Sequence, residues 1–111
     1  GLPERYRDTF FMCDFRGGAA RSGVWAFRNA PKGASFELVQ TDKIIWNILP
    51  TDSEFGRRAG LYILDWIHGW DAPGKGRIYR VFAESEQLDA QAAAVAAILR
   101  DGFGDTPAFS V

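Results

Sequence analysis

The sequence contains one cysteine, one histidine and almost no net charge, and each shortage excludes a class of protein. Cys13 alone cannot form an internal disulfide framework or a cysteine-based structural zinc site, although it leaves the redox compartment open. The chain has 13 Lys and Arg residues and 14 Asp and Glu residues. Its overall electrostatic potential therefore does not favour binding to nucleic acid or to an acidic membrane surface. No apolar run is long enough for a membrane-spanning helix, and residues 1–9 lack the apolar stretch of a signal peptide. We therefore expect no nucleic-acid partner and no membrane span in this chain.

The chain does contain an internal repeat. Residues 10–15 (FFMCDF) and 61–66 (LYILDW) are short apolar runs that end in an aspartate and an aromatic residue. A glycine-containing loop follows each run and a glycine then opens a second apolar run, so each copy predicts a β-hairpin. Asp14 and Asp65 are 51 residues apart, near the period of about 40–50 residues at which a propeller blade recurs. Because a propeller ring needs about four to eight blades, we expect this chain to be part of a longer protein.

The predicted fold class is all-β, with antiparallel sheets forming about two blades of a β-propeller, plus one C-terminal α-helix. Residues 1–84 are expected to form the partial propeller. The expected strands are Thr9–Phe15, Val24–Arg28, Ser35–Gln40, Ile44–Leu49, Asp52–Phe55, Leu61–Trp66 and Arg77–Phe82. After residue 84 apolar residues recur at helical spacing, and Ser85 is a candidate cap. Residues 85–111 are therefore expected to form a helix ending near Gly102 and a tail, as the start of a helical linker.

Five strings between Arg5 and Arg80 resemble a known family: YRDTFFMCDFRGG, KGASFELV, NILPTDSEFG, LYILDWIHGW and PGKGRIYR. They are similar to the propeller proteins called membrane-bound dehydrogenases, distant relatives of soluble quinoprotein (PQQ) glucose dehydrogenase. The resemblance implies the C-terminal end of a larger propeller in a periplasmic or extracellular sugar or alcohol dehydrogenase that passes electrons to an external acceptor. The isolated chain is expected to be inactive. No Cys-x-x-Cys-His motif is present, so this segment is not expected to bind haem.

The resemblance also implies a cofactor site. PQQ and calcium are the cofactors that it suggests, and Arg16 stands where a basic residue of the family contacts the quinone. Leu49 and Thr51, in contrast, stand where the family has arginines before the aspartate equivalent to Asp52. Residues 57–59 (RRA) replace a Pro-Asp-Gly turn of the family, which predicts a longer or looser turn.

Asp14 and Asp65 are the candidate metal ligands, for calcium at the mouth of a ring, and could instead bind substrate there. They end equivalent apolar runs and precede glycine-containing loops. The alternative is that each carboxylate accepts backbone N–H groups in its own loop. We favour this alternative, because structural devices repeat from blade to blade, whereas active sites seldom do.

His68 is the candidate catalytic residue, because a histidine in a long loop can serve as a general base or metal ligand. A lone histidine without a second ligand is weak evidence for either role. Trp70 in the same loop is the candidate sugar-binding residue. The other tryptophans are expected to pack between blades, where large flat side chains bury most of their area.

Residues 69–75 match the first seven positions of a phosphate-binding P-loop. We reject that interpretation, because Gly76 replaces the required Ser or Thr and a strand rather than a helix is expected to follow. Lys75 and Arg77 remain candidates for binding an anionic or carbonyl-bearing group of a cofactor, with a solvated surface pair as the alternative.

A non-catalytic propeller module that binds carbohydrate or protein is the rival to the enzyme. It is favoured by the missing cofactor arginines and by the tryptophan in the loop. A third interpretation is a degenerate product that exposes sheet edges and aggregates. For the first two, the expected partners are the remaining blades of the parent protein, with a small sugar or alcohol as ligand.

Overall fold

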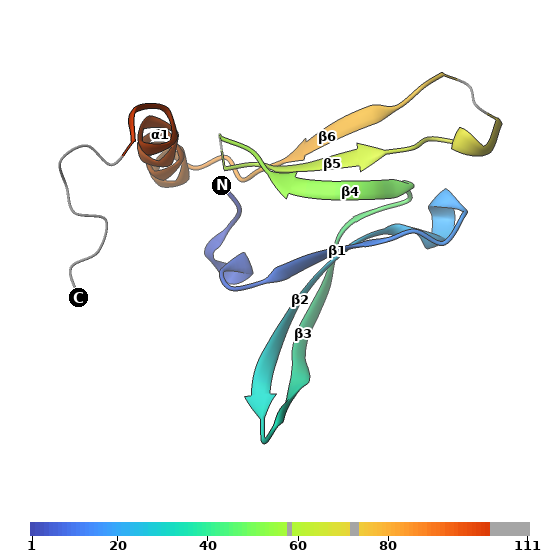
Figure 1. Cartoon of the computed structure of the whole chain (residues 1–111), viewed down its shortest axis with the longest axis horizontal. Coiled ribbons are helices and arrows are strands. Elements are labelled where there is room, and N and C mark those ends of the chain that lie inside the picture. The colour runs from blue at the N-terminus through green and yellow to red at the C-terminus, as the bar shows by residue number, and fades with distance from the viewer. Residues whose placement is uncertain (58, 72–73, 103–111) are drawn as a thin grey trace.

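The computed structural model describes residues 1–57, 59–71 and 74–102. Within these residues, six strands form two three-stranded antiparallel sheets, ordered β1-β2-β3 and β4-β5-β6 (Figure 1). The strands are β1 (Phe10–Asp14), β2 (Gly23–Lys32), β3 (Ser35–Trp46), β4 (Pro50–Phe55), β5 (Leu61–Asp65) and β6 (Arg77–Val81). The helices are α1 (Glu86–Asp101) and the short 3-10 helices η1 (Glu4–Tyr6), η2 (Ala19–Arg21) and η3 (Gly69–Asp71). The mostly-β fold with one C-terminal helix is confirmed, whereas the propeller stays a prediction.

The core lies where the two sheets meet. Val24 of β2 and Ile63 of β5 are each 0% exposed, and Leu61 is 1% exposed. Because side chains alternate along a strand, the same face of β1 adds Phe11 and Cys13, which pack against this core. Burial raises the pKa of the Cys13 thiol, so the side chain acts as a small neutral core residue. The core therefore joins the two copies of the repeat.

The repeat makes β1 equivalent to β5, and β2 equivalent to β6. Among the described residues, β1 pairs with β2 alone, whereas β5 pairs with β4 on one side and β6 on the other. β3 and β4 are thus the strands without a counterpart in the other sheet. Within the described residues, the third strand thus lies beside β2 in the first sheet and beside β5 in the second.

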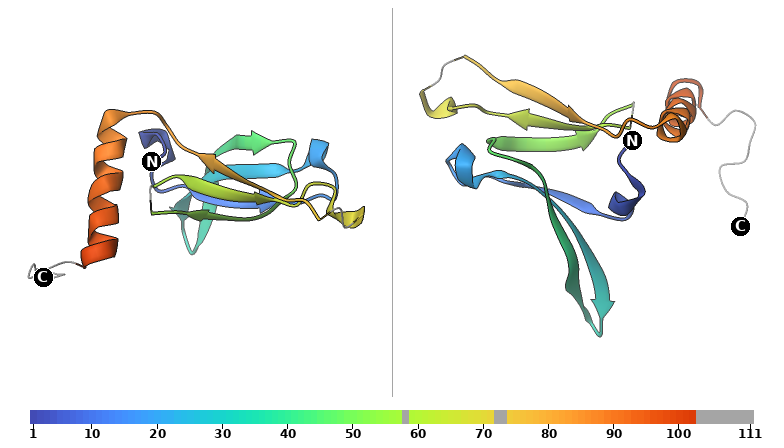
Figure 2. Two further views of the ribbon diagram at one scale, coloured as in Figure 1. Left: turned by 90° about the horizontal axis from the view of Figure 1, so that it is seen from above. Right: turned by 180° about the vertical axis from the view of Figure 1, so that it is seen from behind.

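β2 and β3 form a long arm that projects away from the core (Figures 1 and 2). The expected strands Val24–Arg28, Ser35–Gln40 and Ile44–Leu49 leave a gap over residues 29–34 and a break between Gln40 and Ile44. Instead, β3 continues through residues 41–43, each of which pairs with β2. Backbone hydrogen bonds between β2 and β3, rather than apolar side chains, stabilise this arm. Its polar residues 41–43 therefore show no alternating apolar pattern from which a strand could be predicted. The reversal of the chain is confined to residues 33 and 34, where Gly33 has a φ of 59°.

The connection between the two sheets lies earlier in the chain than expected, at residues 47–49 rather than 50–51. β3 ends at Trp46, because Asn47 adopts a φ of 63°, which interrupts an extended strand. β4 begins at Pro50 rather than at Asp52. A proline is tolerated as the first residue of an edge strand, since its missing N–H is not needed there.

α1 begins and ends as predicted. The Ser85 hydroxyl accepts a hydrogen bond from the backbone N–H of Leu88 at 3.5 Å, which caps the first turn. Gly102 follows the last turn with a φ of 78°. The helix lies at the end of the sheets away from the loops that follow β1 and β5, and it runs across the strands (Figures 1 and 2).

Only part of the apolar stripe of α1 is covered. Ala92 is buried, whereas Val95 and Leu99 are 48% and 59% exposed. No helix within the described residues is long and apolar enough to cross a membrane. The predicted tail, residues 103–111, lies outside the described residues, as does Arg58 of the predicted loose turn.

Candidate functional site

The loops that follow β1 and β5 lie at the same end of the two sheets and contain most of the predicted site residues (Figure 1). Residues 15–22 include η2, and residues 66–76 include η3. The loops meet directly, since the indole N–H of Trp70 donates a hydrogen bond to the carbonyl oxygen of Gly17 at 3.4 Å. The packing of the sheets thus brings together two loops that are far apart in the sequence.

Asp65 anchors the beginning of β4. It is only 6% exposed, and its Oδ1 accepts the backbone N–H groups of Leu49 at 2.9 Å and of Ile67 at 3.1 Å. The N–H of Trp66 donates to the carbonyl oxygen of Leu49 at 2.9 Å. Ile67 has a φ of 41°, which is uncommon for a β-branched residue. The Asp65 carboxylate therefore stabilises both a strained turn and the start of the neighbouring strand.

Asp14 has the equivalent position but different partners. Its carboxylate accepts hydrogen bonds from Arg16 Nε at 2.9 Å and Trp25 Nε1 at 2.9 Å, and Arg16 Nη2 lies 2.8 Å from Oδ2. The hydrogen bond from Arg16, and then that from Trp25, lowers the pKa of Asp14. The backbone N–H of Arg16 donates to Ser22 Oγ at 2.8 Å, and the Ser22 hydroxyl donates to the carbonyl oxygen of Gly18 at 2.8 Å. Polar groups within and beside this loop therefore hydrogen-bond to one another and stabilise its conformation.

The two aspartates do not share a cluster of metal-ligating side chains. Across residues 1–57, 59–71 and 74–102, no group of three His, Cys, Asp or Glu residues could hold a metal ion. Calcium takes about six to eight oxygen ligands, so either aspartate would need further ligands. Asp65 accepts backbone N–H groups, as the alternative interpretation describes, whereas Asp14 accepts side-chain donors. The calcium role stays a prediction.

Phe15, Trp66 and Trp70 form an aromatic platform at this end of the molecule. The ring centroid of Trp70 lies 4.8 Å from that of Trp66 and 6.2 Å from that of Phe15. The Phe15 and Trp66 centroids are 5.7 Å apart. Trp70 is 68% exposed, yet its indole N–H is bonded to Gly17. The indole ring is therefore both held in place and open to solvent.

The predicted catalytic and cationic residues of the longer loop have few contacts. His68 and Lys75 are exposed, and no hydrogen bond or ion pair of either side chain is found among the described residues. Arg77 Nη1 donates to the hydroxyl of Tyr79 at 3.3 Å. A general base is normally oriented by a third group, and His68 has none within the described part of the chain. Its catalytic role stays a prediction.

The rejected phosphate-binding loop includes Ala72 and Pro73, which lie outside the described residues. The element after Gly76 is the strand β6. A P-loop must open a helix, so the rejection of this motif is confirmed.

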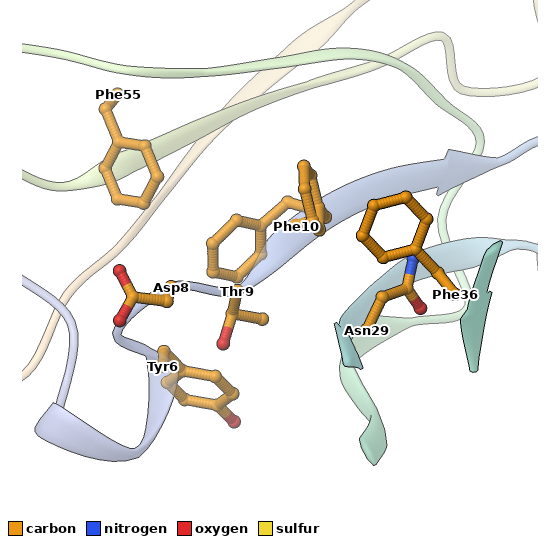
Figure 3. Close-up of a pocket in the computed structure, with 8 residues that line it drawn as sticks. Tyr6, Asp8, Thr9, Phe10, Asn29, Phe36 and Phe55 are labelled. Carbon is orange, nitrogen blue, oxygen red and sulfur yellow. The ribbon is translucent and has the colours of Figure 1, made fainter. Parts of the chain in front are cut away.

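Sequence reasoning missed an aromatic groove at the opposite end of β1. It has a volume of about 700 Å³ and is lined by residues that include Tyr6, Asp8, Phe10, Phe11, Phe36 and Phe55 (Figure 3). A signal was present in the sequence, because adjacent phenylalanines in a strand point to opposite faces and only one face can belong to the core. Phe10 is indeed 60% exposed.

Comparison of this chain with protein-family models, with curated proteins and with solved structures finds no match. The geometry of the loops, the platform and the groove therefore carries the functional argument.

Proposed function

We propose that this chain forms two neighbouring blades of a larger β-propeller, and that the aromatic platform binds a carbohydrate. The two blades are supported by the repeat and by the complementary strand content of the two sheets. Both outer faces also carry exposed apolar side chains, with Met12 at 48% exposure on the first sheet and Ile78 at 69% on the second. Apolar faces of this kind mark interaction surfaces. The remaining blades of the parent protein are the partners that would cover them.

The carbohydrate site rests on one observation, the exposed and immobilised indole of Trp70. A sugar ring has an apolar C–H face that packs on a flat aromatic ring, while its hydroxyl groups need polar partners at the rim. Arg16, with a side chain 59% exposed, and the exposed His68 flank the platform in sequence and supply such groups. Because Trp70 is already fixed by Gly17 and Trp66, little conformational entropy is lost on binding.

Titration of the protein with a panel of neutral mono- and disaccharides, followed by tryptophan fluorescence and calorimetry, tests this proposal. Binding should be saturable, and Trp70→Ala should weaken it about tenfold or more. Stacking of a ring on an aromatic side chain contributes about 1–3 kcal/mol where it is known for nucleobases. Phe36→Ala is the matched control, because Phe36 is 70% exposed and Trp70 is 68% exposed. Binding that is equal in both variants, or absent throughout, contradicts the carbohydrate site.

A dehydrogenase activity of the intact parent protein is the second candidate. It is favoured by the five family-like strings and by the partly exposed Arg16 side chain beside the platform. In that case Arg16, Lys75 and Arg77 would contact a quinone cofactor, and the site would act outside the cytoplasm. The test is dye reduction by the full-length protein with added PQQ, calcium and a sugar panel. Sugar binding without dye reduction supports the binding module instead.

A further inference from the structure

Within residues 1–57, 59–71 and 74–102, β1 is an edge strand, although the equivalent strand β5 is the central strand of its sheet. β4 runs antiparallel to β5, with Pro50 opposite Asp65 and Phe55 opposite Leu61. An edge strand presents unpaired N–H and C=O groups that can pair with a further strand. A strand placed on β1 in the same register would begin opposite Asp14 and end opposite Phe10.

Asp14 can receive the beginning of such a strand. In the second sheet, Asp65 Oδ1 accepts the N–H of Leu49, the residue just before β4. At Asp14, Oδ2 is shared by Arg16 and Trp25, whereas Oδ1 accepts Arg16 Nε alone. An ionised carboxylate offers about four acceptor positions, and the Asp14 side chain is still 14% exposed. One more backbone N–H can therefore be accepted at Oδ1.

The aromatic groove lies where such a strand would end. Phe10 and Phe11 point to opposite faces of β1, yet both line the groove, so the groove passes around the start of that strand. Phe36 from the β2–β3 arm and Phe55 from β4 lie on either side of β1 (Figure 3). The counterpart of Phe55 in an added strand would lie opposite Phe10. The groove is thus placed to hold an aromatic side chain at that position.

We infer that the free edge of β1 binds an extended strand, supplied by another repeat of the same kind and chemically similar to Leu49–Phe55. Asp14 accepts the N–H that precedes the strand, the edge of β1 pairs with its backbone, and the aromatic groove holds its final aromatic side chain. Backbone pairing supplies the affinity and the groove supplies the specificity, as in other cases of strand addition. This strand site rests on the two-blade architecture proposed above, but not on the carbohydrate platform.

A capped synthetic peptide with the sequence Leu49–Phe55 is the probe, titrated into the isotope-labelled full chain and followed by amide NMR shifts. Saturable shifts are expected at Phe10–Asp14. Two further peptides carry N-methyl groups at alternate residues, one at Thr51, Ser53 and Phe55 and the other at Asp52 and Glu54. Alternate N–H groups of a strand face opposite edges, so one methylated peptide should lose at least tenfold in affinity and the other should bind almost as the parent does. This comparison leaves the protein unchanged.

Asp14→Asn should lower the affinity for the unmethylated peptide about threefold to tenfold, because a hydrogen bond to a charged acceptor is replaced by one to a neutral amide. Asp89→Asn, at an exposed aspartate of α1 far from β1 in the sequence, is the control and should bind as the wild type does. Equal affinity of the two methylated peptides, or shifts confined to Leu61–Asp65, overturns the strand site. Shifts at β1 that appear with rising protein concentration alone assign the edge to a second copy and overturn the proposed occupant. Sugar titration of the same samples reports separately on the platform.

Discussion

The loops after β1 and β5 follow the same sequence motif, an aspartate and then an aromatic residue, but the two carboxylates accept hydrogen bonds from different kinds of donor. Asp65 is buried and holds the backbone of a neighbouring strand through Leu49. Among the described residues, no strand pairs with β1 on the side away from β2, and Asp14 instead accepts hydrogen bonds from Arg16 and Trp25. The difference shows that a repeated motif specifies a local acceptor, whereas the identity of the donor depends on which strand lies next to it.

Asp65→Ala should produce the largest effect. It leaves the buried N–H of Leu49 and the N–H of Ile67 without their acceptor, and the loss of hydrogen bonds to a charged group should lower the free energy of unfolding by about 3 kcal/mol. Urea denaturation followed by circular dichroism measures the change. Amide exchange should also show that β4 opens before the rest of the second sheet.

Asp14→Ala is the matched variant for this comparison. Its donors are the partly exposed Arg16 side chain and one part-buried indole N–H, so no fully buried backbone donor loses its acceptor. A clearly smaller loss of stability is expected than for Asp65→Ala. Equal losses for the two variants would mean that the carboxylates are interchangeable and that the anchoring role of Asp65 is wrong.

A second contrast concerns two glycines, Gly23, the first residue of β2, and Gly76, the residue just before β6. A Cβ at Gly23 would overlap the ring of Trp46 and the carbonyl oxygen of Ile45, whereas a Cβ at Gly76 would meet its nearest atom, the Asp65 carbonyl oxygen, at 3.8 Å. Gly23→Ala should therefore destabilise the protein by about 2 kcal/mol. Gly76→Ala should change stability by less than about 0.5 kcal/mol. Thermal unfolding of the pair measures both effects.

A neutral Gly23→Ala would show that β3 can shift away from β2 at this point. A strongly destabilising Gly76→Ala would instead show that both glycines are required for the same reason. Either result would mean that the two hairpins do not differ in how closely packed the glycine at the start of their second strand is.

The short strands of the repeat could be predicted from the sequence because they alternate or run apolar between clear turn residues. The expected strands Thr9–Phe15 and Leu61–Trp66 differ from β1 and β5 by at most one residue at each end. The helix was equally accessible, since its cap, Ser85, and its end, Gly102, are local signals. Local patterns are sufficient where local interactions decide the structure.

The partners of the site residues could not be predicted in the same way. Leu49 reaches Asp65, and Trp25 reaches Asp14, only after strands have paired across the sheet. The aromatic groove is likewise formed by Phe36 and Phe55, which come from different sheets. Such contacts depend on tertiary packing, which no short window of the sequence contains.

The smallest expected effect concerns acid pH and again separates the two loops. The pKa of Asp14 is lowered in the folded protein, first by the hydrogen bond from Arg16 and then by that from Trp25. A carboxyl whose pKa is lower in the folded than in the unfolded state adds stability above the unfolded value of about 3.9, and this contribution disappears as the pH falls through the folded value. The difference in melting temperature between wild type and Asp14→Asn should therefore shrink below about pH 4. The indole N–H resonance of Trp25 should shift over the same range, because its acceptor becomes protonated. A melting difference that stays constant down to acid pH would show that the Arg16 and Trp25 contacts do not depend on the charge of Asp14, and the two aspartates would then differ only in burial.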